Sequence, residues 1–134
     1  RWPHGLQSGL ATNQPAITMD LTAPILAACG GVPDRDRPLD GIDLAPLLRG
    51  ERPPQGRTFY WRVARKDRYQ KAVRSGSWKY VLDGALPLLF DLETDPGERN
   101  DLGFRHPEKL RELERLLAAW EAELAKHPPP VLVR

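Results

Sequence analysis

The sequence predicts an α+β fold in which a four-stranded antiparallel meander is packed by a C-terminal amphipathic helix and preceded by a short helix. Apolar side chains alternate with a period of two between residues 58 and 92, in short segments separated by turns. They then recur every three or four residues from 107 to 126. The first period is typical of half-buried strands, and the second is typical of a helix lying on them.

Four segments are expected to form the strands, at residues 58–64, 68–74, 78–82 and 86–92. Phe59, Trp61 and Val63 should share one face of the first strand. The pair Asp83-Gly84 is a strong hairpin signal between the third and fourth strands. Because every connection is short, consecutive strands should pair antiparallel.

The last element should begin at Pro107, since proline is favoured in the first turn of a helix. Its apolar stripe should lie across one face of the meander and consists of Leu110, Leu113, Leu117, Trp120 and Leu124. The helix should run to about Lys126, where three consecutive prolines end it and start an extended tail.

Near the amino end, a helix capped by Thr18 or Asp20 should run to about Cys29, where Gly30-Gly31 stops it. The helix is almost wholly apolar, so other protein must cover it. A short apolar patch at Ile42, Leu44, Leu47 and Leu48 should form one helical turn within a connector rich in proline and glycine.

Composition is that of an ordinary globular protein, with 134 residues and a formal charge of +2. A single cysteine, Cys29, excludes an internal disulfide, and no apolar run reaches the roughly 20 residues that a membrane span needs. The positive charge is concentrated between residues 57 and 80, where eight Lys or Arg residues accompany one acid, Asp67.

The candidate catalytic and metal-binding residues do not form recognised motifs. His4, His106 and His127 lack the spacing of a metal site or a triad. Two acidic runs, at residues 34–43 and 91–95, resemble calcium loops, but Pro38 and Pro96 occupy positions that such a loop needs. A structural role suffices for the second run, as Asp95 can bind the backbone of its own turn and Asn100 or Asp101 can do so at the next.

The segment with the excess of basic residues is the one candidate for binding. Its cations are interleaved with Tyr60, Trp61, Tyr69, Trp78 and Tyr80, and such a surface can hold a polyanion through charge and stacking. The alternative is a sheet with one solvated face, on which Lys and Arg are ordinary outward residues. No nucleic-acid signature accompanies the basic residues.

Three segments, in order, resemble the type I sulfatases, which are arylsulfatase-like enzymes of the alkaline-phosphatase superfamily. The run LLFDLETDPGERNDL at 88–102 is similar to the family's LYDLxxDPxExxNL element. Residues 71–80 (KAVRSGSWKY) and 39–51 (LDGIDLAPLLRGE) resemble two upstream elements. Trp2-Pro3 and the run 20–30 extend the similarity, with Ala23-Pro24 in place of the usual Pro-Thr.

The resemblance implies a division of the chain into four parts. Residues 1–31 would end an upstream α/β catalytic domain, so that the short helix is left over from it. Residues 32–57 would be a connector, 58–127 a sheet-plus-helix subdomain, and 128–134 a proline-rich tail.

The family hydrolyses sulfate esters with a formylglycine, made from Cys or Ser in C/S-x-P-x-R, beside a Ca²⁺ ion. Neither feature maps onto this chain, since Cys29 is followed by Gly-Gly-Val-Pro. We therefore expect no catalytic residue and no metal ligand here. The chain should complete the fold of a sulfuric ester hydrolase, help to shape its substrate cleft, and be inactive alone.

The implied partners are the upstream catalytic domain and an anionic, sulfated small molecule or glycan, not nucleic acid or membrane. Cations after the first strand would suit such a substrate, and we assign this role to Arg62, Arg65, Lys66, Arg68 and Lys71. The isolated chain should self-associate through its uncovered apolar helix. The alternative function is a stand-alone module that binds a polyanion or a partner through the basic, aromatic sheet.

Overall fold

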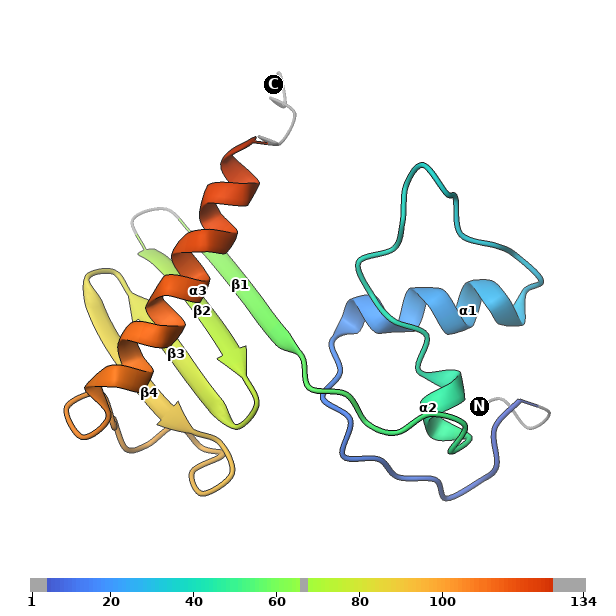
Figure 1. The fold of residues 1–134 in the computed structure, drawn as a ribbon, viewed down its shortest axis with the longest axis horizontal. Helices are drawn as coiled ribbons and strands as arrows, with labels where there is room; N and C mark the ends of the chain where they lie inside the picture. The colour runs from blue at the N-terminus through green and yellow to red at the C-terminus, as the bar shows by residue number, and fades with distance from the viewer. Residues whose placement is uncertain (1–4, 66–67, 127–134) are drawn as a thin grey trace. The chain divides into compact units, whose positions relative to one another are not determined.

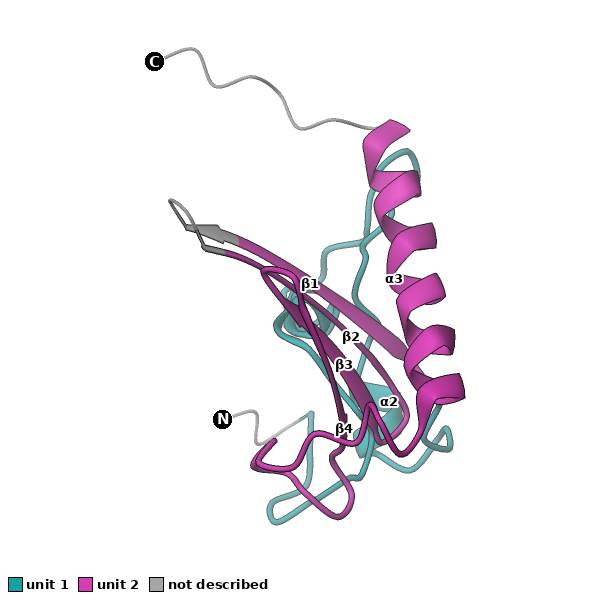
Figure 2. Cartoon of the chain, turned by 90° about the vertical axis from the view of Figure 1, so that its left-hand side faces the viewer, with its two compact units in different colours: residues 1–56 teal, residues 57–134 magenta. Residues whose placement is uncertain are grey.

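The computed structural model describes residues 5–65 and 68–126, and the chain divides into two compact units. Unit 1 comprises residues 1–56 and unit 2 comprises residues 57–134 (Figure 2). Among the described residues, no helix is both long and apolar enough to cross a bilayer. The predicted tail at 128–134 lies outside the described residues.

Unit 2 contains the predicted four-stranded sheet. Its strands are β1 (Thr58–Arg65), β2 (Arg68–Ser75), β3 (Trp78–Asp83) and β4 (Leu86–Asp91), and each pairs antiparallel with the next (Figure 1). The turns after β2 and β3 place Gly76 and Gly84 at φ of 61° and 62°. Tight hairpins require this left-handed backbone, which glycine adopts without strain. The meander and the α+β class are thereby confirmed.

Helix α3 (Pro107–Lys126) lies along one side of the sheet, as Figures 1 and 2 show from two directions. The sheet contacts α3 through one row of register partners, one from each strand: Tyr60, Val73, Tyr80 and Leu89. The last three are buried together with Leu113 and Leu117 of the helix. The Tyr60 ring also stacks on that of Trp120, with centroids 5.1 Å apart. The predicted amphipathic stripe therefore does pack on the meander.

The segment between β4 and α3 is held by aspartate side chains that bind backbone amides. Oδ2 of Asp95 accepts hydrogen bonds from the amides of Arg99 and Asn100, both at 2.8 Å. Oδ1 of Asp101 accepts from the amides of Leu89 and Gly103, both at 2.9 Å. Asp95, in the acidic run at residues 91–95, thus stabilises a turn through backbone hydrogen bonds. Asp101 also joins the loop to β4.

The side chain of Tyr80 gives unit 2 a predicted sensitivity to alkaline pH. Burial, with a smaller contribution from nearby Glu114, raises the pKa of Tyr80 above its ordinary value. The unfolded chain ionises this phenol near pH ~10, whereas the folded unit holds the proton to higher pH. The buried, protonated phenol therefore contributes fully to the free energy of unfolding of unit 2 below pH ~10. This contribution is lost as the pH rises through the pKa of Tyr80 in the folded unit.

We expect urea unfolding to show this loss above about pH 10 in the wild type and a weaker loss in Tyr80→Phe, which cannot ionise. Equal pH dependence of the two proteins would contradict the assignment.

Unit 1 contains a 3₁₀ turn η1 (Thr18–Leu21), the helix α1 (Thr22–Ala28) and the short helix α2 (Ala45–Leu48). The predicted amino-terminal helix thus begins as a 3₁₀ turn, and its N-cap is Ile17 rather than Thr18 or Asp20. The carboxylate of Asp20 binds back to the Ile17 amide at 2.8 Å and reaches the Ile42 amide at 2.9 Å. The second contact spans 22 residues of sequence, so local capping rules could not reveal it.

The surface of α1 and α2 carries uncovered apolar side chains. Leu21 and Ile25 are 53% and 60% exposed. An open hollow of about 480 Å³ is lined by Leu6, Leu21, Pro24, Ile25, Ala28, Cys29, Leu44, Ala45 and Leu48. Within unit 1, α1 therefore lacks the cover that its apolar sequence requires.

Candidate binding surface on the sheet

The structure brings four of the five predicted substrate-binding residues onto β1 and β2. Arg62 is the register partner of Lys71, and Arg65 is the register partner of Arg68 beside the hairpin. Lys66, and the side chains of Arg65 and Arg68, lie outside the described residues. Strand alternation puts Arg62 and Lys71 on the side of the sheet that α3 covers, because they lie two residues from Tyr60 and Val73.

Lys71 is engaged within unit 2. Its Nζ lies 2.6 Å from Oε1 of Glu121 on α3, and its side chain is 18% exposed. The same Nζ lies 5.0 Å from the centroid of the Tyr69 ring, within the range of a cation–π contact. Lys71 thus fastens the helix to the sheet, whereas Arg62 is exposed and has no ion pair among the described residues.

Other cations of the basic segment also have internal partners. Nζ of Lys79 lies 2.5 Å from Oε1 of Glu98, and Nε of Arg74 donates to the carbonyl of Gly76 at 3.0 Å. Glu98 adopts a φ of 53°, an uncommon value for a residue with a side chain. Lys71 and Lys79 are thus paired with carboxylates, and this compensation lowers the attraction of the segment for a polyanion.

The aromatic side chains of the segment divide between the two sides of the sheet. Tyr80 is buried under α3, and Tyr60 and Trp78 pack at its margin, with the Trp78 ring 5.1 Å from that of His106. Trp61 lies on the opposite side and is 37% exposed. Stacking of a ligand on this segment would therefore involve few of the five aromatic residues.

The sheet face opposite α3 carries an apolar row between two rows of mixed polarity, in which Arg74 and Lys79 accompany Phe59 and Phe90, and Gln70 and Asp83 accompany Val63 and Leu86. Trp61, Ala72, Val81 and Leu88 are register partners in one row across all four strands. Phe59, Val63 and Phe90 extend the same side. We call these seven residues the outer face. Their signal was present in the sequence, since Phe59, Trp61 and Val63 alternate with Tyr60, which packs on the other side.

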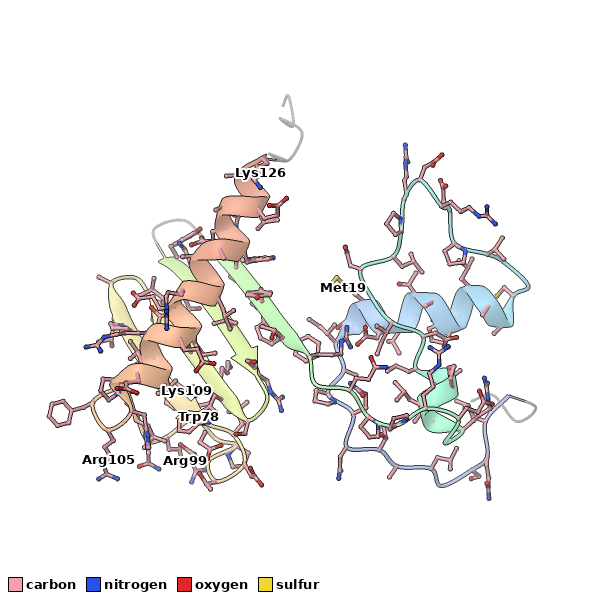
Figure 3. The ribbon with its side chains drawn as sticks, in the orientation of Figure 1. Met19, Trp78, Arg99, Arg105, Lys109 and Lys126 are labelled. Carbon is pink, nitrogen blue, oxygen red and sulfur yellow. The ribbon has the colours of Figure 1, made fainter. Side chains whose placement is uncertain are left out.

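A second hollow lies at the start of α3 and has mixed charge. It is open and about 590 Å³ in volume, and its polar lining is Arg105, His106, Glu108, Lys109, Glu112 and Arg115. Figure 3 shows Arg99, Arg105, Lys109 and Trp78 near this end of the sheet. Lys109 pairs with Glu112 at 2.6 Å, so part of its charge is already compensated.

The described residues do not fit the two groups on which sulfatase chemistry depends. Cys29 is exposed at the end of α1, and the residues that follow it are not those of a formylglycine motif. Among residues 5–65 and 68–126, no three His, Cys, Asp or Glu side chains gather where they could hold a metal ion. The carboxylates of Asp20, Asp43 and Asp101 bind backbone amides instead.

The known proteins reported below as similar to this chain in sequence are all sulfatases. No protein-family model matches the chain. Human arylsulfatase A is 33% identical in an alignment of 144 positions that covers 86% of this chain. Mouse steryl-sulfatase is 29% identical in an alignment of 170 positions that covers 100% of the chain. Canine N-acetylgalactosamine-6-sulfatase is 29% identical in an alignment of 143 positions that covers 86% of the chain.

Solved structures share the fold. The crystal structure of Ps i-CgsB superposes on 89% of the chain with a TM-score of 0.74 and 24% identity. A 2-O GAG sulfatase, BT1596, superposes on 78% with a TM-score of 0.60 and 27% identity. This chain spans only 27% of mouse steryl-sulfatase and 28% of human arylsulfatase A.

Proposed function

We propose that this chain, which corresponds to the carboxyl-terminal region of the sulfatases, completes the fold of a sulfuric ester hydrolase and is inactive on its own. The sequence match to several sulfatases supports the proposal, because it extends over 86–100% of the chain but over only 27–28% of each relative. The remaining three quarters of such an enzyme would then supply the chemistry.

Ca²⁺ and formylglycine, which belong to the family's chemistry, would accordingly be held elsewhere in the whole protein. The carboxylates of Asp20 and Asp95 bind backbone amides, that of Glu121 binds Lys71, and Cys29 lacks the motif context. In this proposal residues 1–31 are the end of the catalytic domain, and residues 58–127 form the sheet-plus-helix subdomain. Residues 32–57 are the connector between the two.

A contribution to the substrate cleft is a further part of the proposal. The exposed Arg62, together with Arg65, Lys66 and Arg68 at the adjoining hairpin, would draw an anionic substrate such as a sulfated small molecule or glycan. Lys71, which is paired with Glu121, would contribute by holding α3 on the sheet. Arg62→Gln in the whole enzyme should raise KM, and an unchanged KM would remove this role.

The uncovered apolar surface of α1 and α2 in unit 1 is expected to contact the upstream domain in the whole protein. In the isolated chain, the exposed Leu21 and Ile25 should instead drive self-association. Sedimentation that shows only a monomer would contradict this expectation.

The test begins with the coding DNA upstream of Arg1. We expect an in-frame extension that contains C/S-x-P-x-R, and we expect the whole protein to hydrolyse an aryl sulfate in the presence of Ca²⁺. The purified 134-residue chain should show no turnover under the same conditions. Metal-dependent turnover by the short chain, or a start codon directly before Arg1, would overturn the proposal.

The stand-alone polyanion-binding module remains the competing function. It predicts salt-sensitive retention of the chain on heparin, lost in Arg65→Ala/Arg68→Ala. The internal pairing of Lys71 and Lys79 favours the first proposal over this one.

A further inference from the structure

The sheet of unit 2 is open, so β1 and β4 each have one edge without a neighbouring strand (Figure 1). Such an edge presents backbone amides and carbonyls that can pair with another chain, and proteins usually protect it. The edge of β4 is protected. The carbonyl of Leu89 accepts from the amide of Leu102, and that of Asp91 accepts from the amide of Asp95, both at 2.8 Å. Pro87, two residues before Leu89, has no amide hydrogen to offer.

The edge of β1 lacks this protection. An amide of the β3–β4 turn donates to the carbonyl of Tyr69 at 2.9 Å, so the backbone groups of Tyr69 face β3. The register partner of Tyr69 on β1 is Ala64, which therefore directs its own amide and carbonyl away from β2. The alternation of a strand gives Thr58, Tyr60 and Arg62 the same outward direction. Among residues 5–65 and 68–126, no backbone group of another segment pairs with these outward amides and carbonyls.

Side chains along this edge are accessible as well. Trp61 and Val63 are 37% and 47% exposed, and Thr58 and Arg62 are also exposed. The strand extends over eight residues and contains no proline. A long, accessible edge of this kind is a template on which another strand can be added.

Antiparallel pairing of β1 with β1 of a second copy would use all of these outward groups. With a twofold axis at Trp61, the backbone of Tyr60 faces that of Arg62 in the second copy, and symmetry forms the reciprocal pair. Thr58 and Ala64 face each other in the same way. An axis at Arg62 would instead place two like charges directly opposite each other, which is unfavourable.

The side chains favour the same register. Trp61 lies opposite Trp61 of the second copy, and Phe59 lies opposite Val63, so these residues of the outer face meet only apolar partners. Aromatic and β-branched cross-strand pairs stabilise antiparallel sheets. On the other side of the sheet, Arg62 lies beside the ring of Tyr60, which can attract a cation. The strand therefore complements itself in both charge and polarity between residues 58 and 64.

We propose that β1 is the dimerisation edge of this protein, and that it joins the four-stranded sheets of two copies into one sheet across a twofold axis at Trp61. Arg57 and Arg65 of the two copies would meet at the ends, so the paired segment is residues 58–64. The inference goes beyond the proposed function and does not depend on it, because it requires only the open edge. In the whole protein the same edge would make the enzyme a dimer.

Hydrogen exchange in the unmutated 134-residue chain tests the pairing directly. The amides of Tyr60 and Arg62 should exchange rapidly in the monomer and about tenfold more slowly, or slower still, at a concentration where sedimentation shows a dimer. The amide of Trp61 faces β2 and should be protected at both concentrations, so it is the internal control. Unchanged exchange of Tyr60 and Arg62 in the dimer, or a monomer at every concentration, would overturn the proposal.

Disulfide cross-linking tests the register. In a background that carries Cys29→Ser, Trp61→Cys should cross-link two copies under mild oxidation, because the two β-carbons would lie roughly 5 Å apart. Val63→Cys is the matched control on the same face and should cross-link far less, since the two copies of residue 63 would be about 13 Å apart. Both variants should behave alike in the whole protein expressed from the full reading frame. Equal cross-linking of the two variants, or cross-linking confined to the 134-residue chain, would contradict the proposed pairing.

Two substitutions separate this edge from the apolar surface of α1. Trp61→Lys should weaken dimerisation by about tenfold, because it removes the aromatic pair and places like charges opposite each other at the axis. Ile25→Lys, at a side chain of α1 that is 60% exposed, should leave the protection of Tyr60 and Arg62 in the dimer unchanged. If Ile25→Lys abolishes the dimer and Trp61→Lys does not, the copies associate through α1 and the proposal fails. Circular dichroism checks the fold of Trp61→Lys, and if it is unfolded, hydrogen exchange in the unmutated chain decides.

Discussion

Replacing Leu113 by alanine should lower the free energy of unfolding of unit 2 by about 3 kcal/mol. Leu113 is fully buried in the cluster that joins α3 to Val73, Tyr80 and Leu89. The substitution removes its hydrophobic transfer energy and leaves a cavity that the surrounding strands and helix can close only in part. Urea unfolding followed by tryptophan fluorescence measures the loss, because Trp61, Trp78 and Trp120 all belong to unit 2.

The matched control is Leu86→Ala, which makes the same chemical change at a side chain that is 58% exposed. We expect it to cost less than about 0.5 kcal/mol, as surface substitutions usually do. If Leu113→Ala and Leu86→Ala were equally mild, α3 would not be packed on the sheet in solution as the structure shows.

Replacing Asp20 by asparagine should destabilise unit 1 by roughly 2 kcal/mol or more. The side chain is fully buried, and its two oxygens accept from different amides, Oδ2 from Ile17 and Oδ1 from Ile42. Asparagine has the same size but only one oxygen, so one amide would face an NH₂ group and lose its acceptor. Hydrogen exchange at the Ile17 and Ile42 amides, followed by NMR, measures the effect directly.

Asp34→Asn is the control for Asp20→Asn. The Asp34 carboxylate accepts from the Asp36 amide at an exposed site, where asparagine keeps an oxygen and water replaces any lost contact. Its effect should be small. Unchanged exchange at Ile17 and Ile42 in Asp20→Asn would show that this carboxylate does not hold the two segments together.

The predicted site was only partly accessible from the sequence. The concentration of cations between residues 57 and 80 could be read directly, but their partners could not. Glu121 lies 50 residues from Lys71, and Glu98 lies 19 residues from Lys79. Whether a lysine is available to a ligand depends on such distant carboxylates, and only the folded chain brings them within reach.

The sequence by itself determined the local structure of unit 2. Three local signals specify the elements of unit 2 and their order, because each acts on its near neighbours. They are the change in the period of the apolar residues from two to about 3.6, the hairpin glycines, and the proline at the start of α3. The same holds for the sulfatase segments, which are contiguous in the chain.

Tertiary structure decided what these elements do to one another. Phe59, Trp61 and Val63 share a face in either case, but a strand with apolar residues on both sides does not indicate which side a helix will cover. Packing assigned α3 to the side of Tyr60 and Val73 and left Trp61 facing outward. The bridge from Asp20 to Ile42 arose in the same way, since burial and long-range hydrogen bonds depend on the whole arrangement of a unit.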